Sequence, residues 1–145
     1  MDFFSAMDIS SSALSAERTR MNLISSNLAN ANSTRTADGG VYRRKDAVFT
    51  AQPLPGKFQA TLNRLSQQAL NQVGVAEIVE DQTPPRVQYD PSHPDANGDG
   101  YVSLPNVNVM EEMVDMMSAT RSYEANITAV QAAKNMALKT LELGR

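Results

Sequence analysis

The residues best suited to chemistry stand in one short stretch, 95–100, where Asp, Asn and Asp alternate and Gly closes the run. This matches the D-x-N-x-D-G opening of a calcium-binding EF-hand loop, in which alternate oxygens ligate the ion. However, the twelfth position holds Asn106 in place of a bidentate glutamate. Asp, Asn and Gly also form ordinary turns without an ion. A calcium-binding helical module using residues 95–106 is therefore only the alternative function, and we expect no metal.

Catalytic chemistry has little support in the sequence. The chain has no cysteine and one histidine, His93, which excludes disulfides, Cys-ligated zinc, thiol nucleophiles and multi-histidine metal sites. His93 lies between Ser and Pro, and the chain has no P-loop, no G-x-S-x-G and no G-x-G-x-x-G motif. We therefore expect no enzyme, no catalytic residue and no cofactor.

Two charged clusters have simple structural interpretations. Glu111, Glu112 and Asp115 fall in the first turns of an expected helix, where the helix dipole favours negative charge. The basic run 43–45, Arg-Arg-Lys, could contact an anion but more often forms a solvated strand edge. The net charge of −3 argues against nucleic-acid binding. No apolar run approaches the ~18 residues of a membrane span, and the N-terminus lacks the basic and apolar regions of a cleaved signal peptide.

The elements that hold these residues follow from where Gly and Pro occur. Residues 33–106 contain six of the seven glycines and all seven prolines, whereas 2–32 and 107–143 contain neither. This distribution predicts long helices at both ends. We therefore divide the chain into an N-terminal helical segment, 1–32, a middle β/loop module, 33–106, and a C-terminal helical segment, 107–145. The two helical segments would pair as one assembly domain.

The C-terminal segment carries the clearest periodicity. Asn108 is the expected N-cap, with Glu111 as its capping-box partner. Alternate steps of four and three residues pick out a mostly apolar stripe, as in a coiled coil: Val109, Met113, Met116, Thr120, Tyr123, Ile127, Val130, Lys134, Ala137 and Leu141. The N-terminal segment has a thinner stripe of Met7, Leu14, Met21, Ile24 and Leu28. Such a thin face predicts a helix that needs a packing partner.

The middle module is expected to be short-stranded and rich in loops. The sequence predicts strands at 41–50, 73–80 and 86–89, a short helix at 61–72 and a loop at 90–106. The expected fold class is mainly α with a small β part (α+β), in which the terminal helices pack as a coiled-coil-like pair.

Several motifs resemble those of one known family. Residues 12–18, SALSAER, and 26–32, SNLANAN, are similar to the N-terminal motif of the axial proteins of the bacterial flagellar rod and hook. Residues 107–113 and 121–126 resemble their C-terminal motif. The middle stretches 39–45 and 89–102 are similar to members of the proximal rod. No recognisable motif covers about residues 50–72.

The resemblance implies a structural protein of the flagellar basal body, needed for motility. Such a subunit is exported by the flagellar type III apparatus without a cleaved signal peptide and assembles in the periplasm. Its partners would be copies of itself, other proximal and distal rod proteins, the rod-to-membrane-ring adaptor and the export apparatus. Together they would form a helical assembly, the drive shaft that transmits motor torque and surrounds the export channel.

The residues expected at the assembly interface are apolar members of the two stripes: Leu14, Met21, Ile24, Leu28, Met113, Met116, Tyr123, Ile127, Val130 and Leu141.

Overall fold

Two long helices and four strands make up the fold in the computed structural model, which describes residues 3–37, 39–53 and 71–143. In chain order the elements are α1 (Phe3–Ala29), β1 (Lys45–Pro53), β2 (Asn71–Glu80), β3 (Arg86–Tyr89), β4 (Tyr101–Leu104) and α3 (Val109–Leu143). The expected fold class, mainly α with a small β part, is confirmed.

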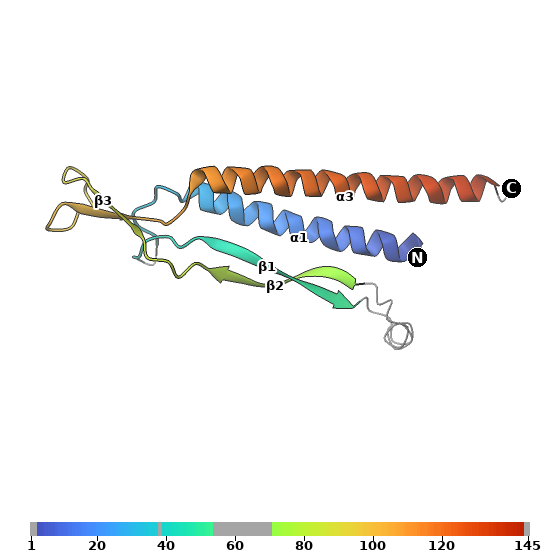
Figure 1. The fold of residues 1–145 in the computed structure, drawn as a ribbon, viewed down its shortest axis with the longest axis horizontal. Coiled ribbons are helices and arrows are strands. Elements are labelled where there is room, and N and C mark those ends of the chain that lie inside the picture. The colour runs from blue at the N-terminus through green and yellow to red at the C-terminus, as the bar shows by residue number, and fades with distance from the viewer. Residues whose placement is uncertain (1–2, 38, 54–70, 144–145) are drawn as a thin grey trace.

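The helices run antiparallel, because the N-terminus of α1 and the C-terminus of α3 lie at the same end of the molecule (Figure 1). Helix α1 packs along α3 on one side and along the β1–β2 hairpin on the other. The smaller β3–β4 pair lies at the opposite end, beyond the start of α3 (Figure 1). Helix α3 is also the longer of the two, and its last turns project past the beginning of α1.

Small residues form the most deeply buried part of the side of α3 that faces α1. Ala119 and Ala133 on α3 are buried, as are Ala16 and Ile24 on α1. Alanine favours helix and allows two helices to approach closely. Of these four side chains only Ile24 is large, and its burial contributes ~1.5–3 kcal/mol. The seam between the two helices is therefore narrow.

The β1–β2 hairpin is antiparallel and irregular at one point, with a shift of register between Val48 and Phe49. It is joined to α1 by Ser12, whose hydroxyl accepts a hydrogen bond from the backbone N–H of Val73 in β2 at 3.1 Å. The same hydroxyl donates to the carbonyl of Ile9 at 2.7 Å. A serine that weakens helix propensity thus links α1 to the hairpin.

The β3–β4 pair is closed by hydrogen bonds of the loop between its strands. The side-chain oxygen of Asn97 accepts the backbone N–H groups of Asp99 at 3.1 Å and Tyr101 at 2.8 Å. Gly100 has a φ of 80°, a left-handed conformation that glycine adopts without steric cost. The rings of Tyr89 and Tyr101 meet edge to face, with centroids 5.3 Å apart.

Most of the predicted elements are confirmed, with corrections in the middle module. Both terminal helices are present, and the side-chain oxygen of Asn108 caps α3 by accepting the N–H of Met110 at 3.1 Å. The loop prediction for 90–106 is wrong at 101–104, which pairs with β3. The predicted helix at 61–72 is wrong at its last two residues, which belong to β2. Its remaining residues lie outside the described part of the chain.

Candidate assembly interface

The predicted stripe of α3 divides between two sides of the helix. Met116, Tyr123 and Val130 are half-buried, in line with buried Ala119 and Ala133 on the side toward α1. Met113 and Leu141 are exposed instead, at 50% and 71%. Ile127 is half-buried as well. On α1, Ile24 is buried and Leu14, Met21 and Leu28 are half-buried.

Near its beginning, α3 carries a strip of large apolar side chains that are exposed. The strip consists of Val109, Met110, Met113, Val114 and Met117, and each of them is at least 42% exposed. Four of the five recur at spacings of three and four residues, so they share one face of the helix. We call these five residues the outer strip. A contiguous exposed apolar face of this kind is typical of an interaction surface.

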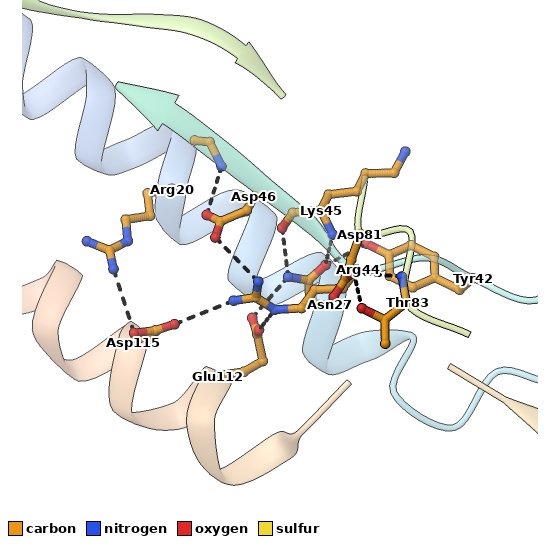
Figure 2. Close-up of polar contacts among 11 residues, drawn as sticks. Arg20, Asn27, Tyr42, Arg44, Lys45, Asp46, Asp81, Thr83, Glu112 and Asp115 are labelled. Atoms are coloured by element: carbon orange, nitrogen blue, oxygen red, sulfur yellow. Dashed lines mark hydrogen bonds and ion pairs between the residues drawn. The ribbon is translucent and has the colours of Figure 1, made fainter. Parts of the chain in front are cut away.

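Asn27, near the end of α1, is the centre of a buried polar cluster that joins three elements (Figure 2). Its side-chain NH2 donates to the carbonyl of Lys45 at 2.9 Å and to Oε2 of Glu112 at 3.0 Å. Its Oδ1 accepts the N–H of Lys45 at 3.0 Å and the hydroxyl of Tyr42 at 2.9 Å. One amide therefore makes four hydrogen bonds, which is its full capacity.

Glu112, in the first turn of α3, is only 1% exposed and is neutralised by Arg44, which directly precedes β1. Nε of Arg44 donates to Oε1 of Glu112 at 2.5 Å. The other two guanidinium nitrogens lie 3.3 Å from Asp46 and 3.6 Å from Asp115. A buried carboxylate is tolerated only when it is paired and hydrogen-bonded, and here both oxygens have partners. We call Asn27, Tyr42, Arg44, Glu112 and Asp115 the polar anchor.

The charge of Arg44 is held firmly in this position. Partial burial acts to lower the pKa of the guanidinium, but the carboxylates of Glu112 and Asp46 outweigh it and raise the pKa above its ordinary value. Asp115 also lies 3.6 Å from Arg20 of α1. The polar anchor thus ties α1, the start of β1 and the start of α3 together through charged groups.

The polar anchor is not among the features that the sequence predicts. Glu112 was explained by the helix dipole alone and Arg44 by a solvated strand edge, yet Glu112 is buried and Arg44 is half-buried against it. The predicted capping-box partner, Glu111, is exposed and makes no hydrogen bond to Asn108 within the described residues. A usable signal was the position of Glu112, which is seven residues before Ala119 and therefore shares its face of the helix.

The loop that resembles a calcium site is held by contacts within the protein. Asp95 accepts a hydrogen bond from the hydroxyl of Thr34 at 2.7 Å, and the Asn97 side-chain oxygen is engaged by backbone N–H groups. Over residues 3–37, 39–53 and 71–143, no group of three or more His, Asp or Glu side chains is arranged to hold a metal ion. Nothing in these contacts favours calcium.

Neither helix is both long and apolar enough to cross a bilayer, over the part of the chain that the structure describes.

Comparison with known proteins places the chain among flagellar proteins. Residues 7–35 match the family described as flagella basal body rod protein. Residues 99–143 match the family of the flagellar basal body rod FlgEFG protein C-terminal region. These two matches correspond to most of α1 and to β4 with α3.

Similar full-length proteins carry a common name. The chain is 45% identical to the flagellar basal-body rod protein FlgC of Bacillus subtilis, over all of both chains. It is 44% identical to FlgC of Salmonella typhimurium, again over all of both chains. It is 43% identical to FlgC of Borreliella burgdorferi, over 94% of this chain and 93% of the relative.

Proposed function

The chain belongs to the FlgC family of flagellar basal-body rod proteins, and we propose that it enters the rod through its two terminal helices. It is a structural subunit of the basal body and assembles with other rod components. The finer proposal is that it contributes to the proximal rod, in contact with copies of itself, with proximal and distal rod proteins and with the rod-to-membrane-ring adaptor.

The observation that carries this proposal is the contrast between the two sides of α3. Toward α1 the helix is covered: Ala119 and Ala133 are buried there, and the larger stripe residues beside them are half-buried. The large side chains of the outer strip remain exposed. Exposed apolar surface is stabilised when it is buried against another molecule. A subunit built in this way gains much of its packing from its neighbours.

We further propose that α1 and α3 form the assembly domain, made from segments 1–32 and 107–145, with 33–106 as a middle module. The polar anchor would keep the two helices in one register, so that every subunit presents the same surface to its neighbours. Subunits related by a rotation that does not close make heterologous contacts and build a tube. Motor torque would pass along the tube through these repeated contacts, around the export channel.

The interface residues remain a prediction: Leu14, Met21, Ile24, Leu28, Met113, Met116, Tyr123, Ile127, Val130 and Leu141. As a structural subunit the chain would need no catalytic step and no cofactor. We propose that the flagellar type III apparatus delivers it without a cleaved signal peptide.

The proposed entry into the rod is tested by replacing the chromosomal gene with one that encodes a tagged chain. We expect the tagged chain to co-purify with intact basal bodies and to support swimming. A matched strain lacking residues 107–145 should export the shortened chain yet fail to retain it in basal bodies. A shortened chain that still enters the rod would show that the C-terminal helix is not needed for assembly.

A further inference from the structure

Helix α3 exposes apolar side chains at both of its ends. The outer strip lies at the beginning of the helix, and Leu138 and Leu141 lie near its end, 49% and 71% exposed. Lys134, also exposed, is spaced four and seven residues from these two leucines and therefore shares their face. We call Lys134, Leu138 and Leu141 the basic end. The last turns of α3 project past the beginning of α1 (Figure 1), so α1 does not obstruct a neighbour there.

The surface around the outer strip is hollowed. A hollow of about 380 Å³ is lined by Arg44, Met110, Glu111, Val114 and Asp115. A second hollow, of about 440 Å³, is also lined by Met110 and includes Val107 and Val109. Side chains of a neighbouring helix pack between those of the strip when they enter such spaces, as knobs enter holes.

The charges of the two faces are complementary. Glu111 borders the first hollow, and Lys134 belongs to the basic end. Neither residue forms an ion pair within residues 3–37, 39–53 and 71–143. Opposite charges that flank apolar patches align two surfaces and exclude wrong registers.

We propose that the basic end of α3 in a second copy of this chain docks on the outer strip. This rests on the proposed function, because rod subunits that point in one direction bring the α3 helices of two copies together in parallel. In this arrangement Leu138 lies level with Val114 and Leu141 with Met117, a stagger of about 24 residues or ~36 Å. Lys134 then lies beside Glu111. The contact is heterologous, so each copy offers a free face to the next.

The competing arrangement is an antiparallel pair. It would bury both faces of both copies at once and close into a dimer, which ends growth. The two arrangements place different residues opposite Met117. In the parallel stagger Leu141 lies there, whereas in the closed antiparallel pair Lys134 does.

Introduced cysteines separate these arrangements, because the chain has no cysteine of its own. Two differently tagged copies, one with Met117→Cys and one with Leu141→Cys, are expressed together in a strain lacking the native gene. Basal bodies are then isolated, oxidised mildly and run on a non-reducing gel. We expect a disulfide-linked pair carrying both tags, at least about tenfold more abundant than for the control pair Met117→Cys with Glu124→Cys.

Each other outcome has a definite meaning. If Met117→Cys links instead to Lys134→Cys, the parallel stagger is wrong. If it links to a different rod subunit, the partner is not a second copy. If both tagged chains are present in basal bodies and no link forms, the docking is wrong while the rod function stands. If neither chain is present, with or without cysteine, the proposed function itself fails.

A charge exchange gives an independent readout. Glu111→Lys on the copy with Met117→Cys should lower the yield of the disulfide-linked pair about fivefold, because Lys134 then faces a like charge. Adding Lys134→Glu to the copy with Leu141→Cys should restore the yield. A yield that does not respond to either change, or that falls further with both, would contradict the proposed contact.

Discussion

The side-chain amide of Asn27 donates a hydrogen bond to the carboxylate of Glu112 across 85 positions of sequence, at 3.0 Å, and both side chains are 1% exposed. The bond crosses from the last turns of α1 to the first turn of α3. A buried polar pair is satisfied in only one arrangement of the two helices. It therefore favours one helix register over the alternative registers. The surface fixed by this register includes the outer strip, whose residues lie on both sides of Glu112 along α3.

Replacing Asn27 with alanine should destabilise the chain. The substitution leaves an oxygen of Glu112 and the backbone groups of Lys45 without their buried partner, and each such group costs ~1–3 kcal/mol. We expect the free energy of unfolding to fall by at least ~3 kcal/mol in urea titrations. Asn32→Ala, at an exposed position, is the matched control and should change it by less than ~0.5 kcal/mol. Equal effects of the two substitutions would contradict the role of Asn27.

Gly100 should not tolerate a side chain. Its φ of 80° is unfavourable for other residues, and an added Cβ would lie 3.0 Å from the Tyr89 ring and 3.2 Å from Pro91. We expect Gly100→Ala to lower the free energy of unfolding by ~1–2 kcal/mol. Gly98→Ala, in the same loop, places its Cβ with nothing within 4 Å and should be close to neutral. Thermal unfolding of the two variants measures the difference directly.

The pKa of Asp90 should depend on Ser92. The Ser92 hydroxyl donates to Oδ1 of Asp90 at 2.6 Å and the Ser92 N–H at 3.1 Å, and these bonds hold the pKa of Asp90 below its ordinary value. This contribution to stability is therefore present above the unfolded pKa of about 3.9 and is lost as the pH falls through the folded value. Ser92→Ala should raise the pKa of Asp90, as measured by NMR titration of the carboxyl carbon. Ser103→Ala is the control and should leave it unchanged.

The periodicity of the sequence was sufficient to place both long helices and three of the strands, because those features depend on residues that are close together. It placed β4 in a loop, since Tyr101–Leu104 is short and follows a cluster of turn residues. Its strand character comes from pairing with β3, and such pairing is not encoded in local composition.

The polar anchor could not be derived from local patterns for a similar reason. Arg44 and Glu112 are 68 positions apart, and each is ordinary in its own segment, one in a basic run and the other in an acidic first turn. The family motif did include Glu112, but a motif match does not say whether a carboxylate is solvated or buried. The stripe on α3 is expected to form a single face, yet its members differ. Met116, Tyr123 and Val130 are half-buried toward α1, whereas Met113 and Leu141 are exposed.

Ile127→Asp tests the predicted interface in the middle of α3. Ile127 is half-buried in the single chain, and in the rod an added carboxylate there would be surrounded by apolar side chains. An unpaired buried charge costs ~3–5 kcal/mol, and the cost recurs at each subunit. We expect normal export, no rod and no swimming on soft agar. A strain with Lys139→Gln, at an exposed position, should swim normally. If the Ile127→Asp strain also swims, this face of α3 is not part of the interface.

The central claim is that α1 and α3 together form the part of the subunit that builds the rod. Electron cryo-microscopy of isolated basal bodies, with this chain traced in the density, tests it most directly. We expect α1 and α3 side by side in the wall that surrounds the channel, with the outer strip buried against a neighbouring helix and the β3–β4 pair outside this wall. Density in which the helices face solvent, or in which the outer strip contacts no other subunit, would contradict it.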